Sequence, residues 1–165
     1  MTDMAIIKAA VVTVSDSRSE VDDLSGRKIV DLLSRAGADI LETLIVSDDL
    51  DEIRGTLQKL TERNDINLLI TTGGTGFGPR DNTPEATRAV IEREAPGISE
   101  AMRRDTAIKT PMAILSRGVC GIRGNTLIIN LPGSPKGVEG CFEVIRPVLR
   151  HAIELISGDT RHENY

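Results

Sequence analysis

Runs of apolar residues alternate with amphipathic segments along the first half of the chain. Runs rich in apolar and β-branched residues at 6–14, 40–46 and 66–72 predict three strands. Between them, apolar residues recur at helical spacing over 29–36 and 50–60, which predicts two helices with one buried face each. A strand, helix, strand, helix, strand order is typical of crossover connections in a mainly parallel sheet.

The pattern continues in the second half, with one ambiguous region. A helix is expected after Pro96-Gly97, and residues 126–131 are another continuous apolar strand. Residues 112–116 and 119–122 are expected to form short strands or a hairpin. A long helix follows the last strand, and Pro147 within it predicts a kink or a break because proline removes a helical hydrogen bond.

Polar residues precede several of these helices, where a side-chain oxygen can accept a hydrogen bond from an otherwise unpaired N–H group. Ser25 is expected to cap the first helix, and the second begins near Ser47–Asp49. Thr83 and Ser134 are expected to cap the helices that follow the third strand and the last strand. Pro84 fits the first turn of its helix, because its missing N–H is harmless there.

These elements predict one α/β domain over residues 1–165, a three-layer sandwich in which helices cover both faces of a mainly parallel sheet. No linker divides the chain, and a polar, loosely held tail is expected from about residue 158. Ligands of such sheets bind beyond the carboxyl ends of the strands. We therefore expect the loops at Ser15, Ser47–Asp48 and Gly73–Gly74 to gather into one site.

The most informative candidate for that site is the glycine-rich run from Thr71 to Asp81. It follows a buried strand and carries little side-chain bulk, so several backbone N–H groups can converge on a phosphate. No Lys-Ser or Lys-Thr follows it, so it is not a Walker A motif, and a tight turn at a crowded strand end is the alternative. The candidate binding residues are Thr72, Gly73, Gly74, Thr75 and Gly76.

Two carboxylates, Asp48 and Asp81, follow strands beside this loop. A carboxylate near a phosphate is repelled unless a cation lies between them, and ligation of Mg²⁺ by both aspartates would account for both positions. Each could instead serve its own helix start, as an N-cap or as a charge that faces the helix dipole. Asp16 and Asp49 are weaker candidates, expected to be solvated.

A second loop, from Leu131 to Gly137, suits a second anion. It offers N–H groups at a helix N-terminus together with one lysine, and a simple capped helix after a proline turn is the alternative. Arg80 and Arg117 are candidate supplementary contacts, although each arginine taken singly is expected to be solvated. The candidate binding residues are Pro132, Gly133, Ser134 and Lys136, with Ser116 as a supplementary contact. Two such loops favour a ligand with more than one phosphate.

The composition argues against several classes of binding partner. The net charge of −5 at pH 7 argues against nucleic acid, whose binding needs many Lys and Arg contacts. Two Phe, one Tyr and no Trp cannot build a platform for stacked bases. No apolar run is long enough to span a membrane, and no secretory signal is recognised, so we expect a cytoplasmic protein. Cys120 and Cys141 are expected to be small core residues, and neither His151 nor His162 is assigned to catalysis.

Taken together, the linked motifs closely resemble those of the molybdenum-cofactor biosynthesis MogA/MoaB family. The resemblance covers nearly the whole chain, from Ile6 to about Ile156. Asn82 stands where the family often has an apolar residue, which is a minor departure. The similar segments are Thr71–Gly76, Arg80–Ala86 and Leu131–Lys136, together with Ser15–Arg18 and Ala113–Arg117.

This resemblance implies a function as well as the three-layer fold of molybdopterin-binding domains. It implies adenylylation of molybdopterin, in which Mg²⁺-ATP and molybdopterin give adenylyl-molybdopterin and pyrophosphate. The family's two essential aspartates match Asp48 and Asp81, which would be catalytic and hold Mg²⁺, while Gly73–Gly76 and Gly133–Lys136 would bind phosphates. A homotrimer or a hexamer is implied, and handover to a molybdenum-insertion protein is expected.

Two alternatives stay open on the sequence alone. A MoaB-type protein would bind molybdopterin without adenylylating it, and would consume no ATP. A hydrolase of pyridine nucleotides is the other alternative, although such relatives carry additional domains that this chain is not expected to hold. The sequence does not assign the nucleotide to one loop and the pterin to the other.

Overall fold

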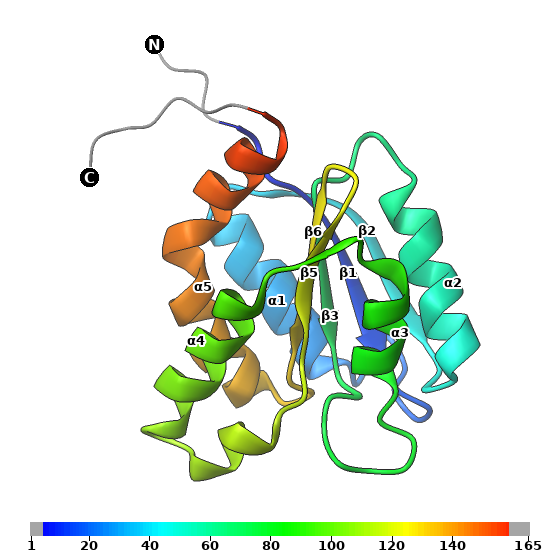
Figure 1. The fold of residues 1–165 in the computed structure, drawn as a ribbon. Coiled ribbons are helices and arrows are strands. Elements are labelled where there is room, and N and C mark those ends of the chain that lie inside the picture. The colour runs from blue at the N-terminus through cyan, green and yellow to red at the C-terminus, as the bar shows by residue number, and fades with distance from the viewer. Residues whose placement is uncertain (1–4, 159–165) are drawn as a thin grey trace.

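The computed structural model describes residues 5–158, which form a six-stranded sheet with helices on both sides (Figure 1). The tail predicted from about residue 158 therefore lies almost wholly outside the described residues. In chain order the elements are β1 (Lys8–Val14), α1 (Leu24–Arg35), β2 (Asp39–Val46), α2 (Leu50–Thr61), β3 (Leu68–Thr72), α3 (Thr83–Val90), β4 (Arg93–Glu94), α4 (Pro96–Ala107), the 3-10 helix η1 (Pro111–Leu115), β5 (Cys120–Arg123), β6 (Thr126–Leu131) and α5 (Pro135–Ile156).

The strand order is β2-β1-β3-β6-β5-β4, and the first four strands in that order run parallel. β5 pairs antiparallel with β6 and with the two-residue strand β4, which the apolar pattern did not predict. The carboxyl ends of the four parallel strands lie side by side. Val14 pairs with Val46, and Thr72 pairs with both Thr13 and Leu131. The loops that leave β1, β2, β3 and β6 therefore start at the same edge of the sheet, as predicted.

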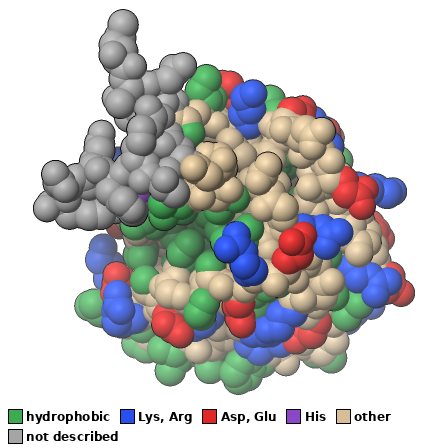
Figure 2. All heavy atoms as spheres, turned by 45° about the horizontal axis from the view of Figure 1, so that its top comes forward, with side chains coloured by type: hydrophobic (Ala, Val, Ile, Leu, Met, Phe, Trp, Pro, Cys, Tyr) green, Lys and Arg blue, Asp and Glu red, His purple; other side chains and the backbone are tan. Residues whose placement is uncertain are grey.

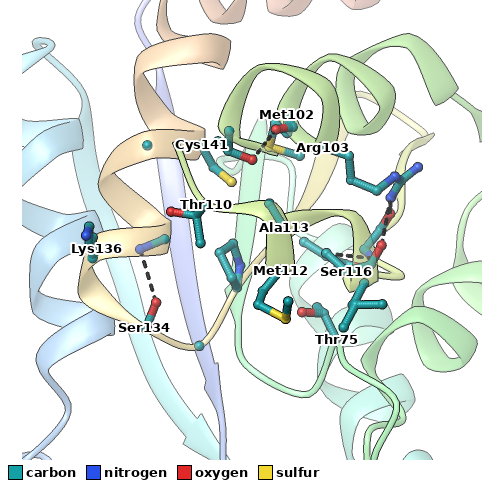
Figure 3. Close-up of a pocket in the computed structure, with 18 of the residues that line it drawn as sticks. Thr75, Met102, Arg103, Thr110, Met112, Ala113, Ser116, Ser134, Lys136 and Cys141 are labelled. Carbon is teal, nitrogen blue, oxygen red and sulfur yellow. Dashed lines mark hydrogen bonds between the residues drawn. The ribbon is translucent and has the colours of Figure 1, made fainter. Parts of the chain in front are cut away.

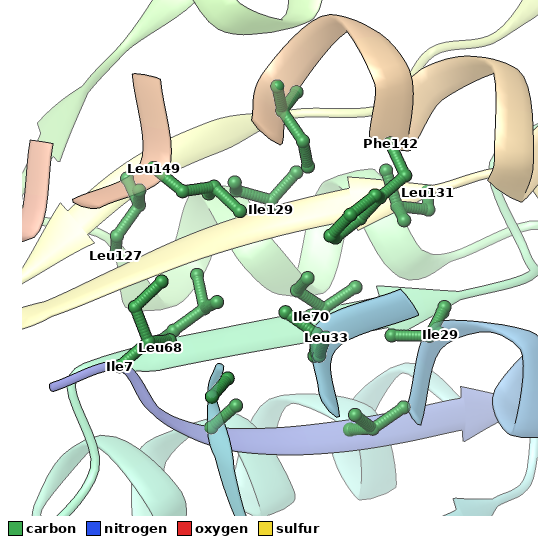
Figure 4. Close-up of a cluster of buried hydrophobic side chains, with 14 of the residues drawn as sticks. Ile7, Ile29, Leu33, Leu68, Ile70, Leu127, Ile129, Leu131, Phe142 and Leu149 are labelled. Carbon is green, nitrogen blue, oxygen red and sulfur yellow. The ribbon is translucent and has the colours of Figure 1, made fainter. Parts of the chain in front are cut away.

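Both faces of the sheet are covered, which confirms the three-layer sandwich. Consecutive strand residues point to opposite faces, so Leu69 belongs to the core beneath α2 and α3, whereas Ile70 belongs to the core beneath α1 and α5. Figure 4 shows the second of these cores, where Phe142 and Leu149 of α5 and Leu33 of α1 close over the strands. This packing fixes the strand ends that carry the site.

Two helix caps differ from the predictions. Asp23, not Ser25, caps α1, because its carboxylate accepts the Gly26 N–H at 3.0 Å. Thr83 does not cap α3, since its hydroxyl donates instead to the Gly73 carbonyl at 2.9 Å. The predicted cap at Ser134 is confirmed, as its hydroxyl accepts the Gly137 N–H at 3.1 Å.

Two other local predictions were wrong in part. Residues 112–116 form no strand, because η1 closes short-range bonds such as Ala113 N–H to Thr110 C=O at 2.9 Å. Of the ambiguous region, only 120–122 enters the sheet, as part of β5. α5 continues through Pro147 as one 22-residue helix, so the predicted break is absent.

Charges are mixed on the surface of the molecule. Figure 2 shows one face, on which Lys and Arg side chains are interspersed with Asp and Glu side chains. Several charged side chains of the described residues form ion pairs, for example Arg63 with Glu42 at 3.0 Å and with Asp65 at 2.9 Å. No helix among residues 5–158 is long and apolar enough to cross a membrane.

Candidate active site at the carboxyl edge of the sheet

The glycine-rich loop after β3 extends below the sheet in Figure 1. Gly73 and Gly74 have φ values of +96° and +67°, a conformation that favours glycine. Gly73 also lies so close to β1 that an added Cβ would be 2.4 Å from the Val14 carbonyl oxygen. Only glycine can turn the chain at this point without displacing β1.

Not every predicted phosphate-binding group of this loop is available to a ligand. The Gly73 N–H donates to Leu131 C=O at 3.2 Å, and the Thr72 hydroxyl donates to Pro132 C=O at 2.7 Å. These two residues join the glycine-rich loop to the β6–α5 loop. By contrast, the N–H groups of Gly74, Thr75 and Gly76 have no acceptor among the described residues. They remain the candidates for binding an anion.

The β6–α5 loop lies directly against the first loop. A Cβ added to Gly133 would be 3.2 Å from Gly73 Cα, so the two backbones are in contact. The N–H groups of Gly133, Ser134 and Lys136 have no acceptor among the described residues. The two predicted anion-type loops therefore form one continuous backbone surface.

A cavity of about 860 Å³ opens beside this surface (Figure 3). Its other walls come from α4, η1 and the first turns of α5, and they carry three cations, namely Arg103, Lys109 and Lys136. The α4–η1 wall could not be predicted from the sequence, because nothing in the spacing of its residues marks a ligand. Of the predicted site residues, those that line the cavity are Gly74, Thr75, Gly76, Asp81, Ser116, Pro132, Gly133, Ser134 and Lys136.

Four predicted site residues do not line the cavity: Ser15, Asp48, Thr72 and Gly73. The first of these shapes the β1–α1 loop, since its hydroxyl oxygen accepts the Arg18 N–H at 3.2 Å. Arg18 in turn donates to the Gly133 carbonyl at 2.7 Å. These residues thus hold neighbouring loops together, a role that the sequence did not indicate.

Asp48 and Asp16 hold each other in place. The Asp16 N–H donates to the Asp48 carboxylate at 2.9 Å, and the Asp48 N–H donates to the Asp16 carboxylate at 3.0 Å. Arg80 binds both carboxylate oxygens of Asp16, at 2.7 and 3.0 Å. Asp16 and Arg80 were expected to be solvated, and both are exposed. The structure shows in addition that they connect the loops after β1, β2 and β3.

The negative charge of Asp81 acts on the Asp48 carboxyl. Burial raises the pKa of the Asp48 carboxyl, and the nearby negative charges of Asp16 and Asp81 raise it further. The Asp81 carboxylate accepts the Gly78 N–H at 2.8 Å and lines the cavity. Asp49, not Asp48, caps α2, through Glu52 N–H at 2.9 Å. The capping role considered for Asp48 is therefore excluded.

This electrostatic contact can be tested by a titration. We expect Asp81→Asn to lower the pKa of the Asp48 carboxyl, because one of the negative charges that opposes its ionisation is removed. NMR detection of side-chain carboxyl carbons between pH 2 and pH 7 measures the change. As a control, Asp51→Asn removes an exposed carboxylate that is not among the causes of the shift, and it should leave the pKa unchanged. If the pKa of Asp48 in Asp81→Asn equals that in the unmodified protein, the electrostatic interaction between the two carboxylates is contradicted.

Both cysteines are buried, as predicted. Burial raises the pKa of Cys120 to about 12 and the pKa of Cys141 to about 11. Because the thiolate is the reactive form, we expect neither thiol to react with a disulfide reagent at pH 8 while the chain is folded. Both should react once the chain is unfolded in guanidinium chloride. Fast labelling of either thiol in the folded protein would show that its burial is not maintained in solution.

The fold and its loops define a class, the α/β domains with a cavity at the carboxyl edge of a mainly parallel sheet. The model of one family, described as a probable molybdopterin binding domain, matches residues 10–151, so the chain belongs to that family. The structure is similar to a solved MoaB from Thermus thermophilus, with 44% identity, a TM-score of 0.86, and coverage of 93% of this chain and 98% of that one. The resemblance to the MogA/MoaB family is therefore confirmed.

Curated relatives agree with this membership. The molybdopterin adenylyltransferase of Helicobacter pylori strain J99 is 41% identical over 165 residues, which cover 98% of this chain and 94% of the relative. The molybdenum cofactor synthesis protein cinnamon of Drosophila melanogaster is 43% identical over 160 residues. In that case the match covers 94% of this chain but only 26% of the relative.

Proposed function

We propose that this protein adenylylates molybdopterin, converting molybdopterin and Mg²⁺-ATP into adenylyl-molybdopterin and pyrophosphate. The observation that carries the proposal is the position of Asp81, which lines a cavity together with two backbone loops whose N–H groups are available to anions. The similarity to an adenylyltransferase along almost its entire length supports the same activity.

The reaction exchanges one phosphorus–oxygen bond for another. An oxygen of the terminal phosphate of molybdopterin attacks the α-phosphorus of ATP, and the bond to the bridging oxygen breaks to release pyrophosphate. The chain must bring two anions together and hold them in line. The N–H groups of Gly74–Gly76 and Gly133–Lys136 would bind phosphate oxygens, and Lys136 would offset negative charge as the leaving group forms.

We propose that the carboxylates of Asp48 and Asp81 hold a Mg²⁺ ion. Each has one oxygen that accepts a backbone N–H, and the other oxygen accepts no hydrogen bond among the described residues. Within residues 5–158, no group of three or more acidic, His or Cys side chains could enclose a metal. Mg²⁺ commonly binds through one or two carboxylates, with water and substrate phosphates as the other ligands. When bound, it would neutralise charge on the triphosphate.

The proposal extends to assembly, location and partners. We propose a homotrimer or a hexamer, a cytoplasmic location, and handover of the product to a molybdenum-insertion protein, as the family resemblance implies. Exposed apolar side chains at the end of α4 and in η1 are consistent with subunit contacts, since Ile108, which follows α4, is 83% exposed and Met112 is 68% exposed. Light scattering on a gel-filtration column would measure the mass, and a monomeric mass would contradict this assembly.

The activity itself has a direct test. Purified protein with molybdopterin, ATP and Mg²⁺ should release pyrophosphate, and omission of molybdopterin or of Mg²⁺ should prevent the release. The alternative, a molybdopterin-binding protein without adenylyltransferase activity, predicts binding in a calorimeter but no consumption of ATP at any Mg²⁺ concentration. The two outcomes separate the two functions.

A further inference from the structure

Arg117 crosses from the segment before β5 to the glycine-rich loop. Its backbone N–H donates to Thr75 C=O at 2.8 Å. Its Nε donates to Gly76 C=O at 2.8 Å, and its Nη2 donates to Asp81 C=O at 2.7 Å. The Arg117 side chain therefore binds both ends of the segment 76–81. Along the chain it is 41 positions from Gly76 and 36 positions from Asp81.

The remaining arm of the guanidinium reaches the next helix. Nη1 of Arg117 contacts the carboxylate of Glu85 in the first turn of α3. The hydrogen bond from Arg117 lowers the pKa of Glu85, so this carboxylate is charged at neutral pH. A planar guanidinium can donate in these three directions at once, whereas a lysine ammonium has no such rigid fork.

A side chain of α4 supports the backbone on both sides of Arg117. Nη1 of Arg103 donates to the carbonyls on either side of it, Gly118 at 2.9 Å and Ser116 at 3.3 Å (Figure 3). Arg103 and Ser116 also line the cavity. The wall of the cavity and the loop that carries Asp81 are thus linked through Arg117.

Apart from Arg117, one side chain ties the segment 76–81 to another loop, since Arg80 donates to both carboxylate oxygens of Asp16 at 2.7 and 3.0 Å. Residues 76–81 belong to no helix or strand, and positions 77–80 are exposed. Within the segment the described hydrogen bonds join only Gly78 and Asp81, through Gly78 N–H to the carboxylate at 2.8 Å and Asp81 N–H to Gly78 C=O at 3.0 Å. Without Arg117, the carbonyls of Gly76 and Asp81 at the two ends of the segment would have no hydrogen-bond donor among the described residues, and Arg80 alone would tie the segment to another loop.

We infer that Arg117 is a positioning residue for Asp81, holding the segment 76–81 in the geometry in which the carboxylate faces the cavity. Arg117 does not line the cavity, so it acts through the backbone carbonyls of Gly76 and Asp81. The expected effect of Arg117 on catalysis rests on the proposed function. Its expected effect on the shape of the segment 76–81 is independent of that function.

The test compares Arg117→Lys with a matched control, Arg123→Lys. Arg123 also lies at β5 and donates to a backbone carbonyl, that of Val90 at 3.0 Å, but it does not line the cavity. Hydrogen exchange of residues 76–81 is expected to be about tenfold faster in Arg117→Lys. The Mg²⁺ concentration for half-maximal pyrophosphate release should rise about 10–100-fold, as for lost outer-shell partners of metal ligands. The KM for molybdopterin and both readouts of the control should stay unchanged.

Each outcome decides the inference. Exchange at 76–81 that matches the unmodified protein would overturn it, as would an equal Mg²⁺ shift in Arg123→Lys. If the unmodified protein releases no pyrophosphate, the proposed function fails, and the exchange measurement still decides the role of Arg117. Should Arg117→Lys not fold, Arg103→Lys replaces it, with faster exchange at 76–81 expected because the turn that presents Arg117 loses its support.

Discussion

Replacing Asp81 with asparagine will reduce the rate of pyrophosphate release by about 10²–10³-fold, the size of effect seen when one electrostatic contact to a transition state is removed. The amide keeps the size of the side chain and its oxygen can still accept the Gly78 N–H, so the loop should keep its shape. What the variant loses is the negative charge that would hold Mg²⁺ beside the triphosphate. Initial rates with saturating molybdopterin and ATP measure the effect.

The matched control for this experiment is Asp49→Asn. Asp49 is an exposed acid next to Asp48, it caps α2, and it does not line the cavity. Asparagine is as good an N-cap as aspartate, so both stability and turnover should stay close to those of the unmodified protein. Turnover in Asp81→Asn within twofold of normal would remove Asp81 from the mechanism. An equal loss in Asp49→Asn would mean that net charge, not position, is responsible.

The strands and most helices could be predicted because their signals are local. Each buried strand is a continuous apolar run, and each amphipathic helix repeats its apolar residues with the helical period. The edge where the loops gather also follows from local order, since alternating strands and helices imply parallel strands. The short strand β4 (Arg93–Glu94) could not be predicted, because two exposed charged residues carry no strand pattern and only pairing with β5 defines it.

The site was harder to predict than the fold. Asp81, Gly74 and Lys136 line the cavity as expected, because glycine, acid and helix-start patterns are visible in the chain. Thr72 and Gly73 instead join two loops. No local pattern in the sequence shows which polar groups form hydrogen bonds within the protein and are therefore unavailable to a ligand. The pairing of Arg80 with Asp16 spans 64 positions, so each residue taken alone looks like a solvated charge. Long-range contacts of this kind need coordinates.

Replacing Gly73 with alanine will lower the free energy of unfolding by about 2–5 kcal/mol, since two costs act at one position. The residue has φ of +96°, which disfavours any side chain, and a Cβ would lie 2.4 Å from the Val14 carbonyl oxygen, in a central strand that cannot move aside easily. Urea unfolding followed by circular dichroism measures the loss.

A second glycine supplies the control. Gly55 lies inside α2, and nothing stands within 4 Å of an added Cβ. Gly55→Ala should therefore raise the free energy of unfolding by about 0.5–1 kcal/mol, through the better helix propensity of alanine. A loss below about 0.5 kcal/mol in Gly73→Ala would show that β1 yields to the new methyl group. The cavity edge would then be softer than the contact between Gly73 and Gly133 implies, and the backbone surface formed by the two loops would not be rigidly preformed for its ligands.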